Sequence, residues 1–190
     1  MIRIGILGDI GSGKSYIAKS FGCPVFNADN EVANLYKENK KIFKKLKREL
    51  PNYFISFPIK KKDISFAILD KRTNLKKIVK IVHKEIRKKM NIFLKKNKKK
   101  KFIILDIPLL LENKLNNKKD ILIFVETKKL EVLKRLKKRE NFNNKLLKKF
   151  RNIQLPLDYK KKKSQFVIKN DFKRKTVSKY VKYILNKINE

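Results

Sequence analysis

The chain has 190 residues, enough for one domain with an apolar core and an inserted lobe. Hydrophobic residues make up 42% of it and aromatic residues 10%, which excludes a chain that is disordered throughout, despite 37% charged residues. The net charge of +36 is spread over most of the sequence, so we interpret it as a compositional drift that places lysines on solvated faces, with recruitment to RNA or to an anionic surface as the alternative.

The first predicted elements are a strand, a glycine-rich turn, a helix and a second strand. Ile2–Leu7 is a run of apolar and β-branched residues, which is typical of a buried parallel strand. Ser15–Phe21 is predicted to be a helix, and Gly22 with the proline that follows marks its end. Pro24–Asn27 is the second short strand. This order of elements is the start of a strand–loop–helix–strand unit.

The glycines are confined to the start of the chain. All five occur at positions 5, 8, 11, 13 and 22, and the remainder of the sequence has none. Glycine is needed where φ is positive or where backbone must approach another group closely. The sequence therefore retains glycine around one loop.

The middle of the chain is predicted to be helical. Apolar residues recur at spacings of three and four from Glu31 to about Lys98, with an irregular link between Pro51 and Pro58. Phe102–Asp106 and Ile121–Val125 are continuous apolar runs, and each is predicted to be a strand.

The last third of the chain continues this alternation of helices and strands. Leu130 to about Ile153 is predicted to be helical and densely basic. Phe166–Ile168 is a last short strand, and Thr176–Ile188 is a closing amphipathic helix. Strands that alternate with helices predict an α/β fold in which helices flank a parallel sheet on both faces, with the glycine loop on the first strand.

The glycine loop contains a phosphate-binding motif. Gly8, Gly13, Lys14 and Ser15 fit the pattern G-x-x-x-x-G-K-[ST], between a predicted strand and a predicted helix. Backbone N–H groups at the helix N-terminus can surround a phosphate where no side chain intervenes, and the helix dipole adds positive potential. We expect Lys14 to reach the β- and γ-phosphates of a nucleotide and Ser15 to coordinate Mg²⁺.

Two carboxylates lie at the carboxyl ends of predicted strands, Asp29 just after Pro24–Asn27 and Asp106 at the end of Phe102–Asp106. In a parallel sheet the carboxyl ends of the strands meet at one edge, where ligands bind. Asp29 is a candidate for the base that takes a proton from an attacking hydroxyl, with an N-cap for a helix near Glu31 as the alternative. Asp106 is a candidate for the acid that holds Mg²⁺, with a cap or turn residue before Pro108 as the alternative.

These motifs resemble the dephospho-coenzyme A kinase family of P-loop small-molecule kinases. GDIGSGKS resembles the family's GGIGSGKS, and NADNEVA (Asn27–Ala33) resembles its DAD followed by a helix. LDIPLLLENKL (Leu105–Leu115) resembles the family's DIPLLFE segment. KRLKKREN (Lys134–Asn141) and QLPLDYKKKKSQFVIKN (Gln154–Asn170) follow its lid and its Q-x-P-L-x-x-K…VI-x-N tail. Together these matches extend over most of the chain.

The resemblance implies transfer of phosphate from ATP to the 3′-hydroxyl of dephospho-coenzyme A, the last step of coenzyme A synthesis. Asp29 would be the base, Lys14 would act on the phosphates, and Arg139 would reach across the transferring group from a lid. Mg²⁺ would be held by Ser15 and Asp106. The residues expected to hold ATP are Gly11, Ser12, Gly13, Lys14, Ser15 and Tyr16.

The resemblance also implies a division of the single kinase domain. The core would comprise residues 1–30, 100–133 and 155–190, the helical substrate lobe residues of about 31–99, and the lid segment residues of about 134–154. Closure of the lid and the lobe would exclude water, which competes as a phosphoryl acceptor.

The chain departs from the family pattern at several positions. Asn27 replaces the first aspartate of DAD, and an amide cannot act as a base. Asp9 stands where the family has glycine, which places a negative charge beside the phosphates. His83 matches a family histidine, but Lys84 replaces the proline after it, so we interpret His83 as a residue of the helical lobe.

Two other functions are weighed against this one. Another P-loop kinase, acting on a nucleoside monophosphate or another small molecule, would share the glycine loop and the lid. An RNA-associated basic protein would use the charge itself, but no RNA-reading motif is found in the sequence. We therefore expect ATP and dephospho-coenzyme A as partners, and no specific nucleic acid.

The expected location is the cytoplasm and the expected state a monomer. Cys23 is the only cysteine, so no disulfide can form within the chain, and we interpret it as a small buried apolar residue. The apolar run at the N-terminus is too short for a signal peptide or a membrane span, so no membrane partner is expected.

Overall fold

The computed structural model describes residues 1–140 and 142–190, and Asn141, at the end of the KRLKKREN match, lies outside the described residues. The chain forms two compact units. The first consists of Met1–Asn27, Lys96–Phe142 and Gln154–Glu190. The second consists of Ala28–Lys95 and Asn143–Ile153. Each unit is described by itself.

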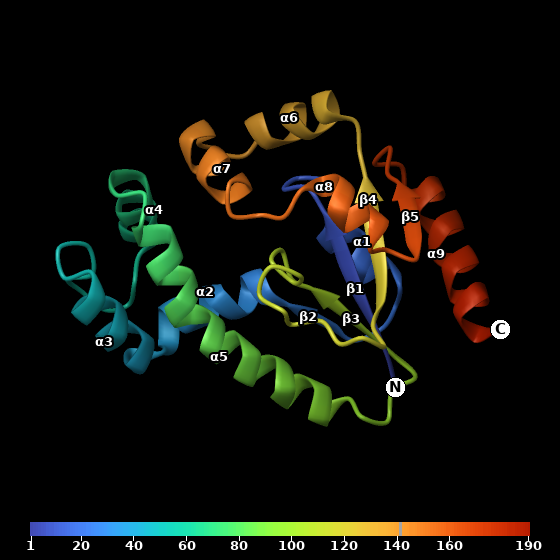
Figure 1. The fold of residues 1–190 in the computed structure, drawn as a ribbon, viewed down its shortest axis with the longest axis horizontal. Coiled ribbons are helices and arrows are strands. Elements are labelled where there is room, and N and C mark those ends of the chain that lie inside the picture. The colour runs from blue at the N-terminus through green and yellow to red at the C-terminus, as the bar shows by residue number, and fades with distance from the viewer. Residues whose placement is uncertain (141) are drawn as a thin grey trace. The chain divides into compact units, whose positions relative to one another are not determined.

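The first unit is built on a parallel sheet of order β2-β3-β1-β4-β5 (Figure 1). Its strands are β1 (Ile2–Gly8), β2 (Val25–Asn27), β3 (Phe102–Asp106), β4 (Ile121–Glu126) and β5 (Phe166–Lys169). Every pairing is parallel. This parallel sheet confirms the predicted fold class. Continuous runs of Ile, Leu and Val suit its strands, because such strands are covered on both faces.

The described residues of the first unit form four helices, namely α1 (Lys14–Ser20), α6 (Lys129–Lys137), α8 (Leu157–Lys162) and α9 (Arg174–Asn189). Helices α1 and α9 contact each other, and α8 packs against β1. In Figure 1, α8 lies in front of the strands and α1 behind them. Helix α8, a short helix that includes three consecutive lysines, was not predicted.

The apolar core lies between the sheet and the pair α1 and α9. Side chains that point to this face of the sheet include Ile4, Ile6 and Ile104, and all three are fully buried. They meet Ile17 of α1 and Val181 of α9. Because side chains alternate along a strand, Gly5 between Ile4 and Ile6 faces the opposite side.

A close approach on that opposite side requires glycine. A Cβ atom at Gly5 would lie 2.5 Å from Leu110 Cδ2 and 2.9 Å from Leu122 Cδ2. Leu110 belongs to the turn that follows β3, and it is fully buried. The absence of a side chain at Gly5 therefore lets this turn pack directly on β1.

An ion pair fastens the start of β1. Arg3 Nε lies 2.9 Å from Asp120 Oδ1, and Arg3 also donates to the carbonyl of Leu115 at 3.1 Å. Burial raises the pKa of the Asp120 carboxyl, and the Asn117 amide and the Arg3 guanidinium oppose that shift. The pair joins β1 to the segment that enters β4, at the end of β1 away from the glycine loop.

The second unit is helical, as predicted for the middle of the chain. Its helices are α2 (Ala28–Glu38), α3 (Lys40–Glu49), α4 (Lys61–Asp70), α5 (Asn74–Lys96) and α7 (Asn144–Arg151). The long helix α5 buries one apolar stripe, including Ile78, Val82 and Ile86, and exposes its lysines. His83 lies on α5. An apolar stripe of this spacing is what a helix needs to pack on one side.

The prediction of one helical segment from Leu130 to Ile153 is wrong. The segment contains two helices, α6 and α7, and the described residues between them are not helical. Asn143 explains why a new helix, α7, begins here. Its side chain accepts a hydrogen bond from the backbone N–H of Leu146 at 3.0 Å and so caps the N-terminus of α7. The break divides the lid segment, so that its first part belongs to the first unit and its second part, with α7, to the second unit.

Cys23 is half-buried against the core of the first unit, and burial raises the pKa of its thiol. Among residues 1–140 and 142–190, no helix has the length and apolar character needed to cross a membrane.

Candidate active site

The P-loop, residues Gly8–Ser15, connects β1 to α1. Gly13 has φ 93° and ψ 15°, a left-handed conformation that glycine adopts without strain. The Ser12 N–H donates to the carbonyl of Asp9 at 3.2 Å, which closes the turn. A Cβ atom at Gly13 would lie 2.5 Å from Asn170 Nδ2, so the loop also has no room for one.

We therefore expect Gly13→Ala to distort the P-loop. Both the positive φ and the Asn170 contact oppose a methyl group, so unfolding should become easier by about 1–3 kcal/mol. A melting curve checks the loss of stability, and ATP titration checks the loss of affinity. Gly22→Ala is the matched control, since Gly22 has φ 66° but nothing lies within 4 Å of its added Cβ. Equal ATP affinity in the two variants would contradict the assignment of Gly13 to the nucleotide-binding loop.

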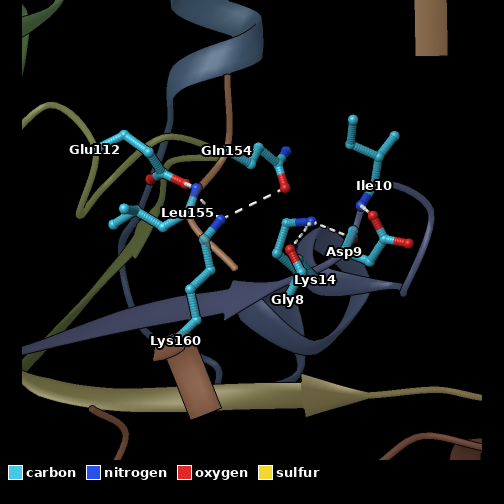
Figure 2. A network of polar contacts seen from close by, with 8 residues as sticks. All are labelled: Gly8, Asp9, Ile10, Lys14, Glu112, Gln154, Leu155 and Lys160. Atoms are coloured by element: carbon cyan, nitrogen blue, oxygen red, sulfur yellow. Dashed lines mark hydrogen bonds and ion pairs between the residues drawn. The ribbon is translucent and has the colours of Figure 1, made fainter. Parts of the chain in front are cut away.

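Lys14 lies inside the loop. Its residue is 9% exposed, and its Nζ atom donates to the carbonyl of Gly8 at 3.2 Å and to that of Asp9 at 2.6 Å (Figure 2). A lysine at the first position of a helix that leaves a strand end brings an ammonium group to the mouth of the loop. Ser15 and Tyr16 occupy the first turn of α1 and are exposed.

Asp9 is engaged by the loop itself. Its Oδ1 atom accepts the backbone N–H of the next residue, Ile10, at 2.7 Å. This hydrogen bond turns part of the carboxylate toward the loop backbone, where an amide proton offsets its charge. The contact explains how an aspartate is accommodated at a position where we expected conflict with phosphate.

The carbonyl of Ser12 is held from two sides. It accepts the hydroxyl of Thr127 at 3.2 Å and the side-chain amide of Asn170 at 2.8 Å. Thr127 follows β4, which pairs with β1, and Asn170 follows β5, the next strand along, so two strands on the same side of β1 support the loop. Sequence reasoning assigned no role to either residue, although a polar residue directly after an apolar strand is a usable signal.

The first half of the lid segment lies against the P-loop. A Cβ atom at Gly11 would lie 2.9 Å from Leu136 Cγ and 3.1 Å from Val132 Cγ1, so α6 contacts the loop closely. Arg139 lies two residues after the end of α6 and is exposed, and its backbone N–H donates to the carbonyl of Leu136 at 3.1 Å. The predicted lid arginine is thus attached to a helix that touches the phosphate loop.

Asp106 ends β3, the strand next to β1. Its residue is 3% exposed, and Asn27 Nδ2 donates to its Oδ2 atom at 2.6 Å. The two residues face each other in the register of β2 and β3. The replacement of the family's aspartate by Asn27 therefore provides a hydrogen bond to Asp106 where a second carboxylate would repel it.

Asp29 occupies the first turn of α2 and is exposed. The helix begins at Ala28, earlier than the predicted start near Glu31, so Asp29 lies within its first turn and not before it. Asp29 follows Asn27 by two residues, and the chain can extend only about 7 Å over that length. Covalent geometry alone keeps Asp29 close to the carboxyl end of β2.

The second unit contains a basic cavity. It has a volume of about 830 Å³ and lies among the start of α5, the end of α4 and α7. Its cationic lining consists of Arg72, Lys76, Lys145, Lys148 and Lys149. The one carboxylate in the lining, Asp70, accepts the hydroxyl of Tyr53. Lys149 donates to the carbonyl of Leu69 at 2.8 Å and so has a structural contact.

The sheet, the glycine loop, the buried lysine and the carboxylate on the adjacent strand define a P-loop phosphotransferase. The model of the dephospho-CoA kinase family matches residues 2–175. The chain belongs to the dephospho-CoA kinase family, whose members are phosphotransferases with an alcohol group as acceptor.

Individual relatives agree with this assignment. The chain is 32% identical to a dephospho-CoA kinase of Wolbachia pipientis wMel over 98% of this chain and 97% of that one. Among solved structures, the Thermus thermophilus protein TT1252 is 25% identical with a TM-score of 0.75, covering 98% of this chain and 97% of that one. A dephospho-CoA kinase from Campylobacter jejuni is 23% identical with a TM-score of 0.63 over 98% and 96%, and it supports the fold.

Proposed function

We propose that the chain transfers the γ-phosphoryl group of ATP to the 3′-hydroxyl of dephospho-coenzyme A, giving coenzyme A and ADP. The observation that carries the proposal is Lys14, buried within a glycine loop at the tip of β1 in a chain that matches the dephospho-CoA kinase family. This is the last step of coenzyme A synthesis, and we expect a monomer in the cytoplasm to carry it out.

ATP would lie along the P-loop, on the residues Gly11, Ser12, Gly13, Lys14, Ser15 and Tyr16. Backbone amides at the start of α1 would face the phosphates, and Lys14 would contact the β- and γ-phosphates. The carbonyl of Ser12 is already held by Thr127 and Asn170, which leaves the loop's amides oriented.

Mg²⁺ would be held by the hydroxyl of Ser15 and the carboxylate of Asp106. Oxygen donors suit this hard cation, and few protein ligands suffice because phosphates and water complete its shell. The Asn27 amide fixes the orientation of the Asp106 carboxylate. When bound, the ion neutralises negative charge on the phosphates.

Asp29 would act as the general base. Its carboxylate takes the proton of the acceptor's 3′-hydroxyl while that oxygen bonds to the γ-phosphorus and the bond from the γ-phosphorus to the β-γ bridging oxygen breaks. ADP leaves with the electron pair of that bond. The position of Asp29 near the end of β2 supports this role, as a tether of two residues links it to Asn27.

Arg139 would stabilise the transferring group from the lid segment. Its planar guanidinium can contact two phosphate oxygens at once, which a lysine cannot do. The contact of α6 with Gly11 supports this, because it anchors the arginine's helix beside the phosphates. The helical substrate lobe, residues of about 31–99, would receive the acceptor.

We further propose that the basic cavity of the second unit holds the diphosphate of dephospho-coenzyme A. Its volume of about 830 Å³ suits part of a nucleotide-sized ligand, and its lining combines cations with apolar Leu69 and Leu75. The N-terminal turn of α5 adds the positive end of a helix dipole.

Removing two cavity cations in R72Q/K148Q should raise the KM for dephospho-coenzyme A by about a hundredfold or more, because each charged hydrogen bond contributes roughly 1.5–3 kcal/mol. The KM for ATP should stay within about twofold of the wild-type value, because the variant loses only contacts to the acceptor. The double variant K80Q/K84Q removes the same charge from exposed α5 residues outside the cavity. Equal effects of both variants would show a general loss of charge instead.

Incubation of the purified chain with ATP, Mg²⁺ and a panel of acceptors tests the function directly. Dephospho-coenzyme A should be phosphorylated at its 3′ position, and nucleoside monophosphates and shikimate should not. Transfer to one of those other acceptors, with none to dephospho-coenzyme A, would refute the proposed substrate and leave the phosphotransferase class intact.

A further inference from the structure

Two lysines of the described chain are buried, and only one of them belongs to the P-loop. They are Lys14 and Lys160, with Lys160 only 1% exposed. The other described lysines remain at least partly exposed to water. Burial of an ammonium group is unfavourable unless a partner compensates it, so a buried lysine in a chain rich in exposed ones requires an explanation.

The partner of Lys160 is Glu112. The Nζ atom lies 2.6 Å from Glu112 Oε1, and the glutamate side chain is itself only 9% exposed. The same Oε1 atom accepts the backbone N–H of Leu155 at 2.9 Å, and Gln154 Oε1 lies 3.5 Å from Lys160 Nζ (Figure 2). One carboxylate oxygen therefore receives both an ammonium and a backbone amide.

The pair joins three parts of the proposed site within the first unit. Glu112 lies in the turn that follows β3, the strand that ends at Asp106. The chain returns to the first unit at Gln154 and Leu155, where the lid segment ends. Lys160 belongs to α8, which packs against β1, the strand that leads into the P-loop.

We propose that Lys160 and Glu112 are positioning residues for phosphoryl transfer. Their ion pair fixes Gln154 and Leu155, where the lid segment ends, with respect to β3 and β1. The inference rests on the proposed function, because it takes the lid and Asp106 as parts of the active site. Neither residue touches the reacting atoms in this assignment, and both act by holding other groups in place.

The variants K160M and E112Q test the pair. Misplacement of reacting groups by about 1 Å can cost on the order of a hundredfold, so kcat should fall by about tenfold or more in both. The KM for ATP should stay within about twofold, because the P-loop itself is unchanged. Each variant is measured with whichever acceptor the wild-type chain phosphorylates, so a wrong substrate assignment would be seen separately from a failure of this inference.

A double variant separates positioning from simple stability. K160M/E112L leaves no uncompensated buried charge, so it should melt above either single variant, yet kcat should remain low because Leu155 N–H has lost its acceptor. If the single variants do not fold, the double variant decides the outcome. A folded variant of the pair with kcat within about twofold of wild type would overturn the inference.

The next lysine on the same helix, which pairs with a glutamate at the end of β4, is the matched control. Lys161 lies 2.6 Å from Glu126 Oε1, but both side chains are exposed, at 44% and 37%. K161M should leave kcat unchanged, since exposed pairs contribute little.

Hydrogen exchange gives a readout besides activity: the Leu155 amide should be protected in the wild-type chain and should exchange about tenfold or more faster in K160M and E112Q. An unprotected Leu155 amide in the wild-type chain would also overturn the inference.

Discussion

Asp29→Asn is expected to lower kcat by about 10²–10⁴-fold, the range for loss of a general base, while ATP binds almost as tightly as before. The amide has the size of the carboxylate but cannot take the proton of the acceptor hydroxyl. Steady-state kinetics with dephospho-coenzyme A measure the first effect, and ATP titration by calorimetry measures the second.

A second acid in the same helical turn is the control for this experiment. Glu31 also lies in the first turn of α2, where it pairs with Lys89 at 3.0 Å. Glu31→Gln removes the same charge near the helix N-terminus, and kcat should remain close to wild type. If Asp29→Asn behaves like Glu31→Gln, then Asp29 stabilises the helix and the base lies elsewhere.

Lys14→Ala is expected to weaken both ATP binding and phosphoryl transfer, with kcat/KM for ATP lower by about 10²–10³-fold, as for other lost electrostatic contacts to a transition state. The side chain supplies the ammonium at the centre of the loop, and no other lysine of the described P-loop can replace it. Calorimetry and steady-state kinetics together measure the two losses.

Lys19→Ala on the same helix is its control, because Lys19 is exposed in the last turn of α1. A loss of similar size in Lys19→Ala would mean that the overall charge of the chain, and not the P-loop ammonium, governs nucleotide binding. The pattern across both experiments is informative: Asp29→Asn should affect turnover alone, whereas Lys14→Ala should affect turnover and ATP affinity.

The sheet and the P-loop were predictable because their signals are local. An unbroken apolar run such as Phe102–Asp106 specifies a buried strand, and β3 has the predicted bounds. The glycines at 8 and 13 similarly marked a loop that must adopt positive φ, as the structure confirms. Asp106 was expected to meet the ends of other strands at one edge of the sheet, and its contact with Asn27 at the end of β2 agrees with this.

The rest of the site depends on contacts between distant parts of the chain. Lys160 lies in a run of lysines that indicates a solvated surface, and its burial follows from Glu112, which no spacing rule connects to it. The break between α6 and α7 was missed because the basic residues around it have good helix propensity, whereas the Asn143 cap is a single-residue signal. The roles of Thr127 and Asn170 likewise depend on the order of the strands, which brings the ends of β4 and β5 to the loop.

The sheet order also determines when each strand can pair while the chain is being synthesised on the ribosome. β1 is made first, but its neighbours β3 and β4 begin only at Phe102 and Ile121. The helices between them can form before any strand of the sheet is paired on both sides. Throughout that interval the apolar segment Ile2–Gly8 has neither of its native neighbours, and such segments are the ones that chaperones protect from aggregation during synthesis.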